Sequence, residues 1–271
     1  MATTVILPVY NAPAALDRCL TSLRQHGSAI DHLQIIDDAS PDPQIAELLA
    51  SLAPFAFPFS IQRNPHNLGF VGTVNAGMDA TADDVLLLNS DTVVTDGWLE
   101  AIHRCAASDA RIASITPFSN NAEICSFPEF CVANPEPADP ELISAALKRV
   151  SAASYPDLPT GVGFCMWLRR DALKAVGAFD QATFGRGYGE ENDWCMRSAA
   201  HGWRHVLCDD AYVIHQGGQS FSAEGLAPGG ENLQRLLARY PHYNALIASF
   251  IQADPLASSR QALAAALGGA G

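Results

Sequence analysis

The stretch Thr3-Thr4-Val5-Ile6-Leu7-Pro8-Val9-Tyr10-Asn11-Ala12-Pro13 (residues 3–13) decides the fold of this chain. Residues 3–7 predict a buried strand, which Pro8 ends. Four apolar side chains then recur at i, i+3, i+4 and i+7, the spacing of a helix with one apolar stripe: Leu16, Cys19, Leu20 and Leu23. A strand followed at once by an amphipathic helix is the first unit of an α/β protein.

The alternation continues along the chain. Further strands are expected at 32–36, 59–61, 85–88, 112–115, 162–168 and 211–214, and helices at 45–52, 69–78, 98–105, 140–150 and from Glu190. This order predicts a mostly parallel sheet with helices on both faces. We expect one α/β domain over residues 1–225 and a C-terminal helical extension over 226–271, whose Ala/Gly tail from Ser258 is frayed.

The amino-acid composition excludes several classes of partner and of metal site. The 271 residues carry 16 basic and 29 acidic side chains, a formal charge of −13, which argues against a nucleic-acid partner or an anionic membrane surface. No apolar run approaches the length needed to span a bilayer, and no signal peptide precedes the first strand, so we expect a cytoplasmic protein. The seven cysteines form no C-x-x-C pair, which excludes a cysteine-based zinc site of that type.

Two nucleotide-binding motifs are absent. The turn after the first strand, residues 8–13, contains no glycine, so the G-x-G-x-x-G fingerprint of dinucleotide enzymes is missing. A G-x-x-x-x-G-K-[ST] phosphate loop is missing as well. Dehydrogenase and P-loop functions are therefore excluded.

Acidic and metal-binding side chains instead follow three predicted strands or open a late helix: Asp37, Asp38, Asp91, Glu190, Glu191, Asp193 and His215. Each alone has a structural explanation, as a turn, a helix cap, a partner of the helix dipole or a core histidine. Together they would crowd carboxylates at one edge of the sheet, which favours a bound cation there.

Five ordered stretches carry a family resemblance: residues 5–11, 35–40, 64–70, 87–91 and 184–197. The chain resembles glycosyltransferase family 2, which has the GT-A fold, and the last stretch is similar to its rhamnosyltransferase and galactofuranosyltransferase branch. Two positions depart from the family pattern. The metal-binding D-x-D is Asn89-Ser90-Asp91, and the usual Glu-Asp pair is Glu190-Glu191.

The resemblance implies an inverting, metal-dependent transfer of a sugar from a nucleotide-sugar donor to a glycan or glycolipid hydroxyl. It nominates Asp91 and His215 as ligands of Mn²⁺ or Mg²⁺, which would stabilise the leaving diphosphate. It places the catalytic base at Glu191, with Glu190 and Asp193 beside it, and we expect Asp193 to pair with Arg197 four residues on.

The resemblance also places donor-binding residues around the nucleotide: Pro8, Tyr10, Asn11, Asp38, Asn67, Gly69, Asn75, Asn89, Ser90 and Arg186. Asn75 is equally well explained as an exposed polar residue, and Arg186 as a solvated loop residue. A pyrimidine diphosphate sugar is the expected donor, with thymidine diphosphate rhamnose as the single best candidate.

Two other functions stay open at this stage: a sugar-nucleotide pyrophosphorylase and a non-catalytic nucleotide-sugar or carbohydrate-binding module. The resemblance is also compatible with a peripheral contact between the protein and a membrane-bound lipid carrier. The acceptor, the linkage and the oligomeric state are not encoded in any motif that we recognise.

Overall fold

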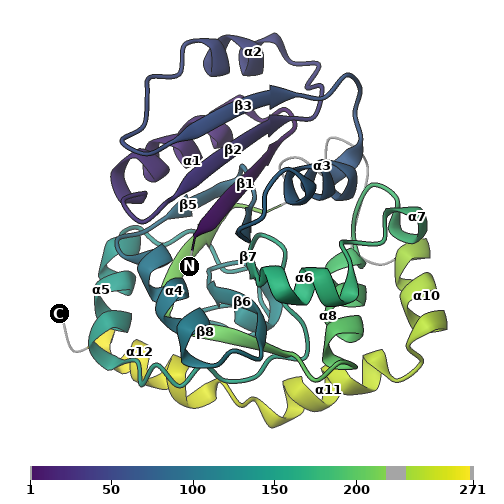
Figure 1. The fold of residues 1–271 in the computed structure, drawn as a ribbon. Coiled ribbons are helices and arrows are strands. Elements are labelled where there is room, and N and C mark those ends of the chain that lie inside the picture. Colours follow the sequence, from purple (N-terminus) through teal and green to yellow (C-terminus); the bar gives the residue numbers. More distant parts are fainter. Residues whose placement is uncertain (1, 218–229, 269–271) are drawn as a thin grey trace.

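A computed structural model describes residues 2–217 and 230–268 of the chain (Figure 1). Eight strands form one sheet in the order β3-β2-β1-β4-β7-β6-β8-β5. The strands are β1 (Thr3–Val9), β2 (His32–Asp37), β3 (Phe59–Arg63), β4 (Asp84–Leu88), β5 (Thr92–Val94), β6 (Ile112–Phe118), β7 (Cys165–Leu168) and β8 (Arg204–His215).

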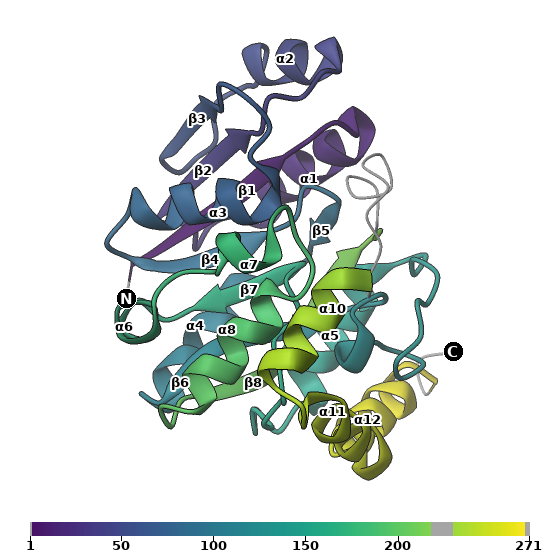
Figure 2. The ribbon, with the colours of Figure 1, turned by 90° about the vertical axis from the view of Figure 1, so that its right-hand side faces the viewer.

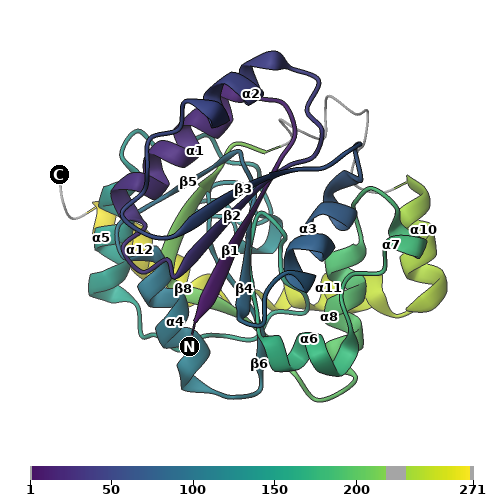
Figure 3. The same ribbon diagram turned by 45° about the horizontal axis from the view of Figure 1, so that its top comes forward.

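Helices cover both faces of the sheet (Figures 2 and 3). They are α1 (Pro13–His26), α2 (Pro43–Ala50), α3 (Gly69–Asp79), α4 (Trp98–Ser108), α5 (Pro140–Val150), α6 (Arg170–Val176), α7 (Gln181–Phe184), α8 (Glu190–Ala199), α10 (Gly230–Arg239), α11 (Tyr243–Ala253) and α12 (Ala257–Gly268), with a short 3₁₀ helix η1 (Glu123–Cys125). The predicted α/β architecture, a sheet with helices on both faces, is confirmed.

The two halves of the sheet differ in strand direction. β1 pairs in parallel with β2 and β4, and β2 with β3, as the alternation predicted. β7 is antiparallel to both of its neighbours, β4 and β6, and β5 is antiparallel to β8. The antiparallel position of β7 and β5 is not apparent in the sequence, because hydrophobic pattern does not encode strand direction.

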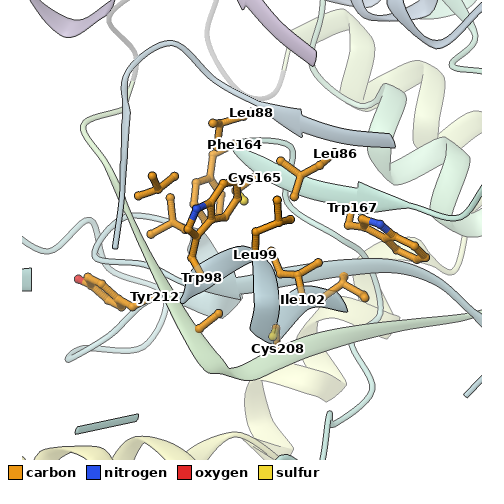
Figure 4. Close-up of a cluster of buried hydrophobic side chains, with 14 of the residues drawn as sticks. Leu86, Leu88, Trp98, Leu99, Ile102, Phe164, Cys165, Trp167, Cys208 and Tyr212 are labelled. Atoms are coloured by element: carbon orange, nitrogen blue, oxygen red, sulfur yellow. The ribbon is translucent and has the colours of Figure 1, made fainter. Parts of the chain in front are cut away.

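Successive side chains along the central strands enter two different cores. Val5 and Leu7 of β1 pack with the helices α1, α2 and α4, whereas Ile6 between them packs with α3. Strand geometry causes this division, since alternate side chains point to opposite faces. Figure 4 shows the first core where α4 lies on the sheet, with Trp98 and Leu99 of the helix against strand residues such as Leu86.

The C-terminal residues pack against the main body of the protein. In place of the expected frayed tail from Ser258, the structure has helix α12, which contacts α5 and buries Leu263 completely. The physical reason is that the tail, although rich in Ala and Gly, carries Leu263 and Arg260 on its inner side. Arg260 pairs with Asp254 and lies over the ring of Phe130.

Across residues 2–217 and 230–268, no helix is long and apolar enough to cross a membrane.

The burial of α12 can be tested by truncating its central leucine. Leu263→Ala should lower the free energy of unfolding by about 2–4 kcal/mol, because it leaves a cavity in a packed core. Leu142→Ala on α5 is the matched control, since Leu142 is 60% exposed. Urea unfolding of both variants provides the comparison, and equal, small losses would contradict the packing of α12.

Candidate active site

One pocket gathers most of the predicted donor-binding residues at the carboxyl ends of β1, β2 and β4. This strand-end pocket encloses about 500 Å³ and is lined by Pro8, Val9, Tyr10, Asp38, Gly69, Phe70, Thr73, Asn89, Ser90 and Asp91. Seven of these ten residues were predicted from the sequence. Open α/β sheets bind ligands at this edge because the loops that follow the strands converge there.

Asp38 holds the wall of the strand-end pocket together. Its Oδ1 accepts hydrogen bonds from the Asn64 side chain and the Leu68 N–H, each at 2.8 Å, and its Oδ2 accepts one from the Gly69 N–H at 2.8 Å. Asn67 also caps the Gly69 N–H through its side-chain oxygen. Asp38 therefore lies in the pocket as predicted, with most of its accepting capacity used to fix the loop before α3.

The turn after β1 is fixed by polar contacts with the loop after β2. Asn11 has a left-handed backbone (φ 56°); its N–H donates to Ser40 Oγ and its side-chain oxygen accepts from the Asp42 N–H. Asp37 accepts from the Ser40 N–H and pairs with Arg63. Asp37 therefore forms a turn, which is the structural explanation that the sequence allowed beside a role in cation binding. Asn11 is not among the residues that line the pocket.

Asp91 and His215 are brought together by the pairing of β5 with β8. Thr92 lies opposite His215 in this ladder, and the Gln216 N–H donates to the Asp91 carbonyl at 3.0 Å. His215 Nε2 consequently lies 3.6 Å from Asp91 Oδ1. Both side chains are largely buried, at 16% and 6% exposure.

The loop after β6 fixes the orientation of His215. Its Nδ1 lies 2.7 Å from the Asn121 carbonyl, to which only a protonated Nδ1 can donate. The Asn120 amide bonds the His215 backbone on both sides, and the Phe164 ring stacks on the imidazole with centroids 5.1 Å apart. In the neutral tautomer that carries its proton on Nδ1, Nε2 presents a lone pair toward Asp91, an arrangement typical of metal-binding histidines.

Glu190 and Glu191 open helix α8 as a close pair of carboxyl groups. Burial raises the pKa of Glu190 well above its ordinary value, and the charge of Glu191 raises it further. Burial raises the pKa of Glu191 to about 7. A buried oxygen of each, Oε2, has no hydrogen-bond partner among the described residues. A carboxylate with a pKa near neutrality is suited to accept a proton.

Asp193 does not belong to this pair. Its side chain is fully buried and bonds Arg197 at 2.8 Å, Arg239 at 2.5 Å and the Tyr240 hydroxyl at 3.0 Å. The predicted pair with Arg197 is confirmed, and Asp193 faces away from Glu191 as expected, because two positions along a helix turn the side chain to another face. Asp193 instead fastens α10 to α8, which lie side by side in Figures 1 and 2.

Besides Asn11, three predicted donor residues lie outside the lining of the strand-end pocket: Asn67, Asn75 and Arg186. The Asn75 amide donates to the Phe179 carbonyl at 2.9 Å and accepts from the Phe179 N–H at 3.1 Å, so it ties α3 to the loop before α7. Arg186 contacts two residues that line the pocket, since its carbonyl accepts from the Phe70 N–H and it lies against Gly69. A Cβ on Gly69 would lie 2.7 Å from the Arg186 Cα, so only glycine permits this contact.

Tyr188 lies between the strand-end pocket and the glutamate pair. Burial raises the pKa of its phenol, and the charges of Glu191, Glu190 and Asp91 raise it further, in that order. Its backbone is left-handed (φ 68°) between Gly187 and Gly189, which is a strained conformation for a tyrosine. Tyr188 is therefore within electrostatic range of both the metal-capable pair and the glutamate pair.

The sequence analysis did not identify Asn120, Asn121, Arg239 and Tyr240. The Asn120-Asn121 dipeptide directly follows buried β6 and could have been found as another polar group at a strand end. Arg239 and Tyr240 give no such signal, because their role depends on where α10 docks.

Residues 4–177 match the family described as Glycosyl transferase family 2, which is more than half of the chain. The chain belongs to this family, and the fold is GT-A. A pre-mycofactocin glycosyltransferase of Mycobacterium tuberculosis is 29% identical over 223 residues, which cover 78% of this chain and 42% of the relative. The chain thus spans less than half the length of that curated relative.

Solved structures of low sequence identity share the fold. GalNAc-T7 with UDP, GalNAc and Mn²⁺ has a TM-score of 0.66 at 14% identity, covering 88% of this chain and 48% of that one. The mannosyltransferase PcManGT from Pyrobaculum calidifontis, in complex with GDP-Man and Mn²⁺, has a TM-score of 0.57 at 14% identity, covering 99% and 74%. S. aureus TarS 1-349 has a TM-score of 0.56 at 16% identity, covering 99% and 79%.

The raised pKa of Glu191 predicts how stability depends on pH. A carboxyl whose pKa is 4.5 when unfolded and about 7 when folded stabilises the protein fully below pH 4.5, and this contribution is lost as the pH rises to about 7. Glu191→Gln is neutral at every pH. The free energy of unfolding of this variant, relative to that of the wild type, should therefore increase between pH 4.5 and about 7. Urea unfolding at several pH values, with Glu47→Gln on exposed α2 as control, measures this difference, and a difference that does not change with pH would contradict it.

Proposed function

We propose that this chain is an inverting, divalent-metal-dependent glycosyltransferase that uses a nucleoside diphosphate sugar. The observation that carries the proposal is the position of Asp91 and His215 Nε2, 3.6 Å apart, at the rim of the strand-end pocket, with the Glu190–Glu191 pair within electrostatic range of Tyr188 beside it. A cation site and a carboxylate base facing one space are the two requirements of this transfer.

Asp91 and His215 fit a divalent cation. The carboxylate is an oxygen ligand, the oriented imidazole presents an unprotonated nitrogen, and this mixed donor set suits Mn²⁺ or Mg²⁺. In residues 2–217 and 230–268 no third His, Cys, Asp or Glu joins them, so water and the donor's phosphate oxygens would complete the coordination. The bound cation would neutralise charge on the leaving diphosphate.

Glu191 acts as the base in this proposal. It would accept the proton of the acceptor hydroxyl while that oxygen attacks the anomeric carbon from the face opposite the diphosphate, and the configuration at that carbon inverts. Glu190, with its pKa raised even further by the neighbouring charge, stays protonated and can donate a hydrogen bond to Glu191.

The donor's nucleotide would lie in the strand-end pocket, with its base near Tyr10 and Asp38. Asp38 Oδ2 accepts one hydrogen bond from the protein, which leaves a lone pair for an imide N–H or a ribose hydroxyl. The turn of residues 8–11 has no glycine to admit a larger base, which favours a pyrimidine. Thymidine diphosphate rhamnose is our best candidate for the complete donor.

The metal proposal predicts a loss of nucleotide affinity. Asp91→Ala and His215→Ala should each weaken Mn²⁺-dependent binding of UDP at least about tenfold, because each removes a ligand of the bridging cation. Calorimetric titration with UDP in the presence of Mn²⁺ measures the affinity, and the control variant is Asp17→Ala, at an exposed position of α1. Unchanged affinity in both variants, or full transfer in excess chelator, would refute the metal site.

The base proposal predicts opposite phenotypes for neighbouring acids. Glu191→Gln should lower kcat about 10²–10⁴-fold with little change in donor Kd, because only proton acceptance is lost. Asp193→Asn should mainly lower the free energy of unfolding, by about 3 kcal/mol, since it removes the charge paired with Arg197 and Arg239. Steady-state kinetics and urea unfolding of both variants test this. A stable Asp193→Asn with the larger loss of kcat would move the base to Asp193.

The donor proposal predicts a ranking of nucleotides. With Mn²⁺ present, thymidine and uridine diphosphates should bind more tightly than guanosine diphosphate, because the turn of residues 8–11 restricts the space for a purine. Calorimetry of the three nucleotides gives the ranking. Tightest binding of guanosine diphosphate contradicts the pyrimidine assignment, whereas a preference for uridine over thymidine removes only the rhamnose candidate.

A further inference from the structure

A second hollow, of about 890 Å³, lies next to Glu191. We call it the helix pocket, and its lining is Glu123, Ile124, Thr160, Gly161, Val162, Tyr188, Gly189, Glu191, Asn192, Leu233, Leu236, Tyr243, Asn244 and Ile247. No lining residue is shared with the strand-end pocket, so the helix pocket is a separate compartment that ends at the proposed base.

The charges in the helix pocket have one sign. Glu123 and Glu191 contribute two carboxyl groups, and its described lining contains no Lys, Arg or His. The closest cations on the adjoining helices are directed elsewhere: Arg239 pairs with Asp193 and Asp180, and Arg235 pairs with Glu231. An anionic group that entered this pocket would meet like charge without compensation.

One wall of the helix pocket is apolar and comes from the C-terminal helices. Leu233 and Leu236 of α10 and the Tyr243 ring and Ile247 of α11 form this wall, and Leu236 and Tyr243 also pack with Phe184 in a small core. Leu233 is 37% exposed, so its side chain is accessible to a ligand in the hollow.

Specific contacts hold this wall in place. The Asn232 side chain donates to the carbonyls of Phe184 and Gly187 at 2.8 and 2.7 Å, and Arg239 bonds Asp193. The apolar wall is thereby fixed to the same glycine loop that carries Tyr188, and the spacing between wall and base is preset.

We infer that the helix pocket binds the acceptor, and that this acceptor is an uncharged glycoside with an apolar aglycone. The inference rests on the proposed function, because the acceptor hydroxyl has to reach Glu191. The sugar fits the polar side formed by Asn192, Thr160 and the two carboxyl groups, and the aglycone fits the wall of Leu233, Leu236 and Ile247. A phosphorylated or carboxylated acceptor is excluded by the like charge.

Ligand-detected NMR tests this without turnover. The wild-type protein, with UDP and Mg²⁺, is mixed in turn with p-nitrophenyl glucoside, the same glucoside phosphorylated on its sugar, and methyl glucoside. The neutral aryl glucoside should show saturation transfer to its aromatic protons and bind at least about tenfold more tightly than either of the others. Leu233→Glu should abolish this signal, whereas Leu246→Glu, equally exposed at 38% but outside the pocket lining, should keep it.

Each alternative result overturns the inference. One such result is that the phosphorylated glucoside binds as tightly as the aryl glucoside or more tightly. Another is that the aryl glucoside gives no signal at millimolar concentration. The third is that Leu233→Glu and Leu246→Glu reduce the signal equally while both variants keep the melting temperature of the wild type. The NMR experiment measures binding, whereas the kinetic experiments measure glycosyl transfer. A protein that binds the aryl glucoside but transfers no sugar would therefore contradict the proposed function and leave this inference standing.

Discussion

The antiparallel pairing of β5 with β8 is the constraint on which the candidate site depends. β5 has only three residues, yet its ladder sets Thr92 opposite His215 and so joins a residue that follows the fourth strand to the end of the eighth. β8 can reach β5 because it is long and because its register against β6 shifts between Pro117 and Phe118. A slip of one residue in this ladder would turn His215 to the other face of the sheet.

A second set of contacts positions the glutamate pair. Helix α8 begins at Glu190 after Gly189, and Asp193 one turn later is bonded by three side chains from α8 and α10. The helix cannot rotate without breaking these buried bonds, so Glu191 is held toward the helix pocket. Burial of the Glu190–Glu191 pair makes its ionisation costly, so the folded protein is destabilised as the pH rises above neutrality.

The sequence predicts most of the sheet, because buried strands and amphipathic helices have distinct hydrophobic periods. Residues 3–7 and 85–88 are examples, and both lie inside observed strands. β5 has no such signal, since Thr92-Val93-Val94 is too short to show a period. The tail after Ser258 is similar: its composition indicates disorder, and only the burial of Leu263 on α5 makes it a helix.

The strand-end pocket was largely predictable, because polar residues at the ends of parallel strands converge by geometry. The side-chain bonds were not. Asn75 and Asp193 have the residue types of a binding site. Their structural roles arise from Phe179, Arg239 and Tyr240, which are 46 to 104 residues away in sequence. Tertiary contacts of this range have no signature in a single sequence.

The two pockets draw their walls from different parts of the chain. Residues 8–91 line the strand-end pocket, whereas residues 123–124, 160–192 and 233–247 line the helix pocket. The walls are linked through the loop before α8, where Gly69 and Phe70 of the strand-end pocket contact Arg186, two residues before Tyr188 of the helix pocket. Because α10 and α11 line the helix pocket alone, substitutions on these helices can accumulate and reshape that compartment while the wall of the other stays unchanged. Under the proposed roles of the two pockets, such substitutions would change the acceptor and keep the donor.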